Sequence, residues 1–135
     1  MNRSARLAPT RRAAWLWGLF LLALTSWPSP PQVPVLSGIP SIDKVVHSLL
    51  YGVFALLLFR AVRWPGRPGL TLSRALAVVG ALAVFGTADE THQAFIPGRS
   101  MEGRDALMDT AGSAVGALLA RWRGRRRKRE PKTVA

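Results

Sequence analysis

The chain has 135 residues, 49% of them hydrophobic, and these hydrophobic residues are bunched into segments instead of being spread at amphipathic spacing. Nineteen Lys and Arg against seven Asp and Glu give a formal net charge of +12, which suits either nucleic acid or an anionic membrane surface. The chain has no cysteine, which excludes disulfides and thiolate metal sites. The length fits one domain, and the composition is poor for a water-soluble globule.

The first apolar segment covers residues 13–27, follows four arginines and is stopped by a proline cluster that begins at Pro28. It is short for a membrane span, which needs about 20 residues. A cleaved secretory signal has the same order of basic and apolar regions. Because the small-x-small cleavage site is poor and Pro28 follows Trp27 directly, we favour a retained anchor, and the cleaved signal stays open as the alternative.

Three further apolar segments follow, at residues 45–64, 70–88 and 106–122. The first two of these approach the length that crosses a bilayer, with arginines near one end that can snorkel to the interface. The last is interrupted by Asp109, but it carries a G-x-x-x-G pair that begins at Gly112 and is typical of closely packed transmembrane helices. The sequence therefore predicts an all-α integral membrane bundle of four transmembrane helices.

The distribution of Lys and Arg orients these segments, because basic residues are retained on the cytoplasmic side. Sixteen of the 19 precede the first segment, flank the loop between the second and third, or follow the fourth. The three on the other side are Lys44, Arg99 and Arg104. We therefore predict a multi-pass protein of the cytoplasmic membrane with both termini cytoplasmic: residues 1–12 form a basic N-terminus, 13–122 the membrane domain and 123–135 a basic tail.

The tail contains the run RWRGRRRKRE, which could be read as a nucleic-acid patch. A charge run after an apolar helix is more often a stop-transfer signal and an anchor on the lipid surface. We expect the lipid bilayer as the partner of this run, and no nucleic acid. The oligomeric state stays open.

In the predicted topology, polar residues of the second, third and fourth segments converge on the extracytoplasmic face. Asp43, His47 and Tyr51 lie at i, i+4 and i+8 and form one stripe. Glu90 and Gln93 share a face at i, i+3, whereas the neighbouring histidine points elsewhere. These faces are predicted to line one polar site.

The fourth segment adds Asp105 and Asp109 on the face that also carries the glycines, so both should point into the bundle. Arg99 lies in the loop before them. The predicted ligand-binding residues are Asp43, Lys44, His47, Tyr51, Glu90, Gln93, Arg99, Asp105 and Asp109. Supporting or solvated roles are expected for Asp89, His92 and Glu102.

Structural explanations exist for several of these residues. Asp43 and Asp105 could cap helix starts, Lys44 could be an interfacial anchor, and Arg99 could be a turn residue that faces water. His47 could form a satisfied polar pair with Tyr51. Glu90 and Asp109 fit such explanations less well, because carboxylates within or beside apolar spans need partners such as His47 or Arg99.

These residues resemble the VanZ-like membrane protein family. Its pattern D-K-x-x-H-x-x-x-Y is matched by Asp43, Lys44, His47 and Tyr51. Its pattern D-E-x-x-Q-x-F-x-P-x-R is matched by Asp89, Glu90, Gln93, Phe95, Pro97 and Arg99. Its pattern D-x-x-x-N-x-x-G-x-x-x-G is matched by Asp105, Gly112 and Gly116, with Asp109 where the family usually has Asn.

The resemblance covers roughly residues 42–120. It implies a small multi-span helical protein of the cell envelope, in a family named for a member linked to teicoplanin resistance. Neither a reaction nor resistance follows from motif similarity alone.

Two functions fit the pattern. In the first, the outer site binds or modifies an anionic or amphipathic envelope component, such as a lipid-linked cell-wall intermediate, through Arg99. In the second, the protein is a membrane-embedded hydrolase or transferase: His47 is general base or nucleophile, Glu90 or Asp105 orients it, and Arg99 stabilises developing charge. The catalytic candidates are thus His47 and Glu90, although the chain has no recognised nucleophile motif.

Two further possibilities rank lower. A transporter or proton relay is disfavoured because the polar groups stay at one face. His47, Glu90, Asp105 and Asp109 offer nitrogen and oxygen ligands, but no spacing matches a known ligand motif. The sequence therefore leads us to expect neither a metal nor a cofactor.

Overall fold

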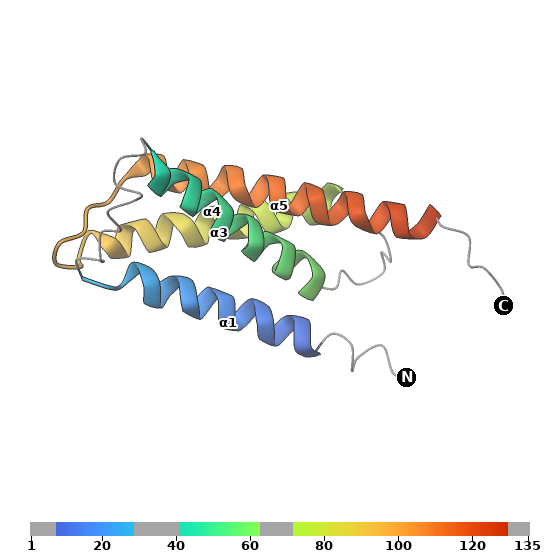
Figure 1. Ribbon diagram of the computed structural model, residues 1–135, viewed down its shortest axis with the longest axis horizontal. Coiled ribbons are helices and arrows are strands. Elements are labelled where there is room, and N and C mark those ends of the chain that lie inside the picture. The colour runs from blue at the N-terminus through green and yellow to red at the C-terminus, as the bar shows by residue number, and fades with distance from the viewer. Residues whose placement is uncertain (1–7, 29–40, 63–71, 130–135) are drawn as a thin grey trace.

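The computed structural model describes residues 8–28, 41–62 and 72–129, and the fold is given for these residues. They form four α-helices: α1 (Ala8–Thr25), α3 (Ile42–Ala61), α4 (Leu72–Gln93) and α5 (Gly103–Arg129). Successive helices run in alternating directions along the bundle (Figure 1). The prediction of an all-α fold is confirmed.

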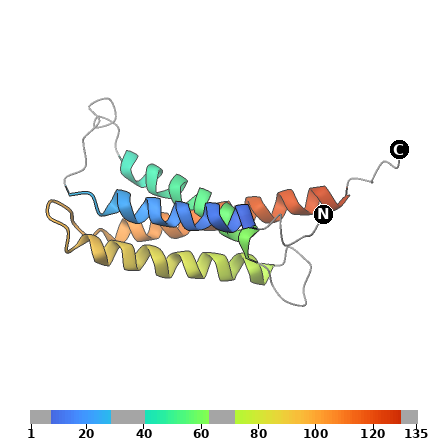
Figure 2. The same cartoon turned by 90° about the horizontal axis from the view of Figure 1, so that it is seen from below.

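Both views place the C-terminal ends of α1 and α4 beside the N-terminal ends of α3 and α5 (Figure 1; Figure 2). We call this the polar end of the bundle, and it carries Thr25, Asp43, Lys44, Gln93 and Asp105. The opposite end, where α1 begins and α5 finishes, is called the basic end and carries Arg11, Arg12, Arg60, Arg74 and the arginines of α5 from Arg121 onwards. Acidic and basic residues are therefore largely separated along the long axis.

The helices extend beyond the apolar segments predicted for them. α1 begins at Ala8 instead of residue 13, α3 at Ile42 instead of 45, and α5 covers Gly103–Arg129 instead of 106–122. α4 continues past residue 88 to Gln93. The reason is that apolarity marks the segment buried in lipid, whereas backbone hydrogen bonding continues through polar residues until the chain turns. Residues 63–64 and 70–71 of two predicted segments lie outside the described residues.

By length and composition, α3 and α4 are long and apolar enough to cross a membrane, and they are the two candidate spans among the described residues. α1 includes two arginines, and α5 includes both aspartates and the basic tail. Two of the four predicted spans are thus supported, and the other two stay a prediction.

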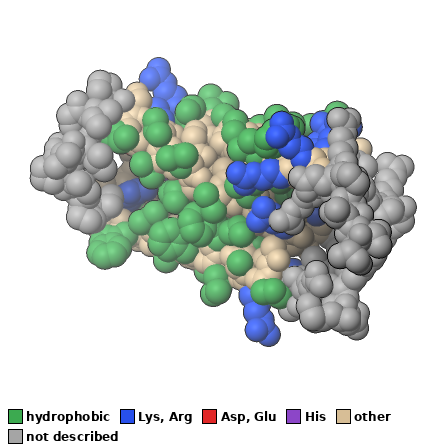
Figure 3. Space-filling view, turned by 45° about the vertical axis from the view of Figure 1, so that its right-hand side comes forward, with side chains coloured by type: hydrophobic (Ala, Val, Ile, Leu, Met, Phe, Trp, Pro, Cys, Tyr) green, Lys and Arg blue, Asp and Glu red, His purple; other side chains and the backbone are tan. Residues whose placement is uncertain are grey.

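Large apolar side chains are exposed along all four helices. Trp15, Leu49, Val84 and Leu107 are 76%, 65%, 71% and 69% exposed. Figure 3 shows hydrophobic side chains spread over one lateral face, with Lys and Arg gathered towards the basic end. An apolar surface of this extent is unusual for a protein surrounded by water and suits contact with lipid.

The closest helix pair is α3 with α5, and small residues make this approach possible. A Cβ added at Gly112 or Gly116 would overlap the backbone of Ser48 or Gly52 on α3. Ser48 also donates its hydroxyl to the carbonyl oxygen of Met108 on α5, at 3.1 Å. The close-packing role predicted for the G-x-x-x-G pair is confirmed.

α1 and α4 pack around this pair. Trp17 on α1 donates its indole N–H to the carbonyl oxygen of Leu50 on α3, at 3.0 Å. Phe54 on α3 meets Phe85 on α4 edge to face, with ring centroids 5.5 Å apart. The core therefore draws side chains from all four helices, which positions the residues of the polar end.

Candidate functional site

Lys44 joins three carboxylates at the mouth of the polar end. Its ammonium lies 2.7 Å from Asp43, 3.2 Å from Glu102 and 3.1 Å from Asp105. Asp43 and Glu102 are half exposed, whereas the side chain of Asp105 is 13% exposed. Lys44 thus links α3 to α5 and to the preceding loop, a more specific role than interfacial anchoring.

A second group lies one turn deeper, between α3 and α5. His47 Nδ1 is 3.0 Å from Asp109 Oδ1, and its Nε2 is 3.9 Å from Asp105 Oδ2. Asp109 is fully buried, and Tyr51, 2% exposed, lies beside it. The prediction that both aspartates point into the bundle is confirmed, as is the expected pairing of Asp109 with His47.

Gly86 on α4 leaves the space that the side chains of Asp109 and Tyr51 occupy. A Cβ at this position would lie 3.0 Å from Asp109 Oδ2 and 3.3 Å from the Tyr51 ring. The α4 backbone therefore lies close to Asp109 Oδ2, the carboxylate oxygen that His47 does not contact.

The third group connects the end of α4 to the loop that follows. Gln93 donates its side-chain amide to Glu90 Oε1 at 3.1 Å, and the backbone N–H of Glu102 donates to Glu90 Oε2 at 2.9 Å. Arg99 donates through Nε to Gln93 Oε1 at 3.1 Å and through a second nitrogen to the same oxygen. Glu90 and Gln93 are buried on one face as predicted, but the partners of Glu90 are amides, not the expected His47 or Arg99.

Asp89 was expected to be supporting or solvated, and its burial excludes the solvated role. It is 2% exposed and accepts a hydrogen bond of 2.7 Å from the hydroxyl of Thr25 on α1. Thr25 is itself buried. Thr25 was not among the residues predicted for the site, and its signal in the sequence was a hydroxyl directly after the apolar stretch of residues 13–24.

His92 and Glu102 are exposed. Glu102 nevertheless contributes to the polar end through its backbone N–H and through the ion pair with Lys44. Asp43 lies in the first turn of α3, where a carboxylate is favourable, but no side chain caps this helix. The residue before α3, Ser41, adopts a left-handed backbone conformation with φ 58°.

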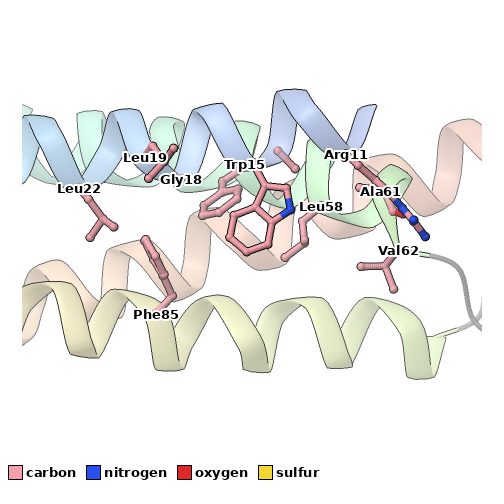
Figure 4. Close-up of a pocket in the computed structure, with 11 residues that line it drawn as sticks. Arg11, Trp15, Gly18, Leu19, Leu22, Leu58, Ala61, Val62 and Phe85 are labelled. Carbon is pink, nitrogen blue, oxygen red and sulfur yellow. The ribbon is translucent and has the colours of Figure 1, made fainter. Parts of the chain in front are cut away.

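The helices also leave an apolar groove on the lateral surface. Figure 4 shows α1 and α4 facing each other across it, with Trp15, Leu19, Leu22 and Phe85 among its lining residues. Arg11 lies at one end and donates to the carbonyl oxygen of Ala61 at 3.4 Å. None of the nine predicted ligand-binding residues lines this groove, so it is separate from the polar cluster.

The arrangement defines a class of protein: among the described residues it is a small all-α protein with two helices long and apolar enough to cross a membrane and a buried polar cluster at one end. Residues 4–124 match the family model described as VanZ/LLP1. The chain therefore belongs to the VanZ/LLP1 family, which confirms the resemblance noted in its sequence. Comparison with curated proteins and with solved structures finds no match.

Proposed function

We propose that this protein binds an anionic component of the cell envelope, such as a lipid-linked cell-wall intermediate, at the polar end. The observation that carries the proposal is the state of Arg99. Its guanidinium is half-buried and hydrogen-bonded to Gln93, and among the described residues it forms no ion pair. A held but unneutralised guanidinium suits bidentate recognition of phosphate or carboxylate.

The neighbours of Arg99 hold it in place without cancelling its charge. Gln93 accepts from Arg99 through its oxygen and donates through its nitrogen to Glu90. Lys44, by contrast, is neutralised by three carboxylates. Arg99 is therefore better suited than Lys44 to meet an incoming anion, and its fixed position lowers the cost of binding.

The proposal includes a four-span topology with both termini cytoplasmic and the polar end outside. Three features support it: the alternating helix directions, the excess of basic residues at the opposite end, and the exposed apolar surface of all four helices. An extracytoplasmic Arg99 would meet envelope intermediates at the depth of their headgroups.

Binding of a polyprenyl phosphate and of the corresponding neutral polyprenol tests the proposal. The full-length protein, reconstituted in nanodiscs, is compared with Arg99→Gln and with Arg104→Gln, a control at an exposed arginine of the first turn of α5. We expect Arg99→Gln to weaken phosphate binding by about 10- to 100-fold, the scale of a hydrogen bond to a charged group. Arg104→Gln should stay within about twofold of the parent.

Equal binding of phosphate and polyprenol, or equal affinity in the parent and Arg99→Gln, would contradict the proposal. In cells, a deletion strain complemented with Arg99→Ala should accumulate the same envelope species as the uncomplemented strain. That species would identify the substrate class.

One observation favours catalysis as a second candidate function. His47 Nδ1 lies 3.0 Å from a fully buried carboxylate, the arrangement in which an acid orients an imidazole for general-base work. The orienting residue in this mechanism is Asp109, whereas the sequence suggested Glu90 or Asp105 for this role.

Release of inorganic phosphate from a polyprenyl pyrophosphate tests this candidate. The purified protein should turn the substrate over, and His47→Ala should lower the rate by about 100-fold or more, whereas His92→Ala should leave it unchanged because His92 is exposed. A His47→Ala variant that turns over at the parent rate would remove the enzymatic function while leaving the binding function intact.

A further inference from the structure

Three helices bring metal-ligating atoms together in the interior of the polar end. One ligand atom each from His47 on α3, Glu90 on α4 and Asp109 on α5 lie within 4.8 Å of one another. We propose that these three side chains bind a divalent transition-metal ion. The inference goes beyond anion binding and does not depend on it, since Arg99 bonds to Gln93 and contacts none of the three proposed ligands.

The separation between His47 and Asp109 fits a bound ion, and the Glu90 ligand atom lies within 4.8 Å of both. Metal bonds to nitrogen and carboxylate oxygen of about 2.0–2.2 Å place adjacent ligand atoms roughly 3–3.5 Å apart and opposite ones near 4.2 Å. His47 Nδ1 and Asp109 Oδ1 are 3.0 Å apart. A set of one imidazole and two carboxylates suits Zn²⁺ or Mn²⁺ better than a hard cation such as Mg²⁺.

The balance of charge points the same way. Asp89, Glu90 and Asp109 are 2%, 1% and 0% exposed, yet the one described basic side chain in direct contact with any of them is His47. Burying an ionised carboxylate costs several kcal/mol unless it is compensated. A divalent cation between Glu90 and Asp109 supplies the missing positive charge.

An unused acceptor provides a separate observation. Asp109 Oδ2 is fully buried and receives no hydrogen bond of normal geometry, although the buried Tyr51 hydroxyl lies beside the carboxylate and interacts with it. Buried acceptors without a well-formed hydrogen bond are uncommon in native proteins and call for a specific cause. A cation bound to the Asp109 carboxylate provides one.

Glu90 is already held in the manner of a metal ligand. Its two oxygens accept from the Gln93 amide and from the Glu102 N–H, at 3.1 and 2.9 Å. Each carboxylate oxygen keeps a second lone pair, so these bonds orient Glu90 without preventing coordination.

The outer carboxylates do not form an equivalent site. Asp43, Glu102 and Asp105 also approach one another closely, but the ammonium of Lys44 already lies among them, within 3.2 Å of each. A cation there would compete with Lys44. We therefore expect substitutions of Glu90 or Asp109 to lower the metal affinity, and a substitution of Glu102 to leave it unchanged.

The experiment uses the full-length protein purified in detergent with an affinity tag that contains no histidine. After chelator treatment and desalting, Zn²⁺ or Mn²⁺ is titrated by calorimetry, and bound metal is counted by elemental analysis. We expect about one ion per chain and a higher Tm with metal. Asp109→Asn and Glu90→Gln should each lower the affinity by more than about tenfold.

Three matched variants serve as controls. His92→Ala removes an exposed histidine and Glu102→Gln an exposed carboxylate of the outer group, so both should retain full metal affinity. Arg99→Gln should also retain it, which separates failure of this inference from failure of the proposed anion binding.

Two results would overturn the inference. One is less than about a tenth of an equivalent of either metal in the parent protein. The other is stoichiometric binding that survives Asp109→Asn but is lost in Glu102→Gln. A metal-dependent rise in Tm in the parent that disappears in Asp109→Asn would support it, because this near-isosteric change preserves packing while removing the charge.

Discussion

At the residue scale, the hydrogen bond between Thr25 and Asp89 makes a test of how α1 contributes to the polar end. Thr25→Val keeps the shape of the side chain but leaves Asp89 Oδ1 without its donor in a buried position. We expect a loss of about 1–3 kcal/mol in the free energy of unfolding. Reversible unfolding in mixed detergent micelles measures it.

The matched control is Thr87→Val on α4. Its exposed hydroxyl bonds only to the carbonyl oxygen of Ala83 in its own helix, so the change should be close to neutral. Equal effects of the two substitutions would show that the Thr25–Asp89 contact contributes nothing.

The ion pairs of Lys44 should differ in strength although they share one ammonium. The Asp43 side chain is 52% exposed and that of Asp105 is 13% exposed, so solvent screens the first pair much more. Double-mutant cycles of Lys44→Met with Asp43→Asn and with Asp105→Asn measure the two coupling energies. We expect at most about 0.5 kcal/mol for Asp43 and a larger value, less sensitive to salt, for Asp105.

A coupling energy for Asp43 that equals or exceeds that for Asp105 would contradict this ranking. The result would then mean that water reaches Asp105 more freely than its burial indicates.

Helical periodicity predicts which residues of one helix share a face, but not which neighbouring helix that face contacts. The i, i+4 spacing of Asp105 and Asp109 correctly predicted that both face inward. Asp89 is not on the face of Glu90, because it lies about 100° away around α4, and it contacts α1 instead. Residues 13–24 of α1 are all apolar, so the local pattern showed a hydroxyl at Thr25 but not that this hydroxyl would meet a carboxylate.

At the scale of elements, the pair α3 and α5 depends on the absence of side chains at two positions. Gly112→Ala would push a methyl group into the backbone of Ser48, which cannot move aside as a flexible side chain could. We expect destabilisation of about 1–3 kcal/mol or more, with separation of the two helices. Gly80→Ala is the control, because a Cβ there meets nothing within 4 Å.

Helix propensity predicts that Gly80→Ala is neutral or stabilising by up to about 1 kcal/mol. Both variants are compared by unfolding of the full-length protein in mixed micelles. Similar stabilities for Gly112→Ala and Gly80→Ala would mean that α3 and α5 do not approach as closely as described.

The sequence could indicate that α5 has a close-packing face, but not which helix packs on it. A G-x-x-x-G pair allows any backbone to approach. α5 packs on α3 because Gly52 and Ser48 are small enough to allow the approach. Small residues of this kind are common in apolar segments, so they did not single out α3 in the sequence. The length of α4 was likewise underestimated. The predicted segment stops before Asp89, but the helix continues to Gln93 because polar side chains do not break its backbone hydrogen bonds.

At the scale of the whole molecule, the proposed topology has a direct test, because the chain has no cysteine of its own. Ser100→Cys introduces a thiol in the exposed loop at the polar end, and Arg125→Cys introduces one at the basic end. An impermeant maleimide added to intact cells should label only Ser100→Cys. Permeabilised cells should show labelling of both variants.

Labelling of Arg125→Cys alone in intact cells would reverse the proposed orientation. Labelling of both thiols without permeabilisation would mean that the helices do not separate two compartments. Either result would remove the extracytoplasmic placement of Arg99 while leaving the geometry of the polar end unchanged.

The order of partners along the chain has a consequence for biosynthesis. Thr25, Lys44 and His47 precede the carboxylates that they contact, Asp89, Asp105 and Asp109, by about 60 residues. In each of these three pairs, the hydrogen-bonding partner is therefore synthesised before the carboxylate. We expect α4 and α5 to enter the bilayer as a hairpin whose connecting loop is held by Glu90, Gln93 and Arg99. The carboxylates of this hairpin can then pair with polar groups of α1 and α3 that are already in the membrane.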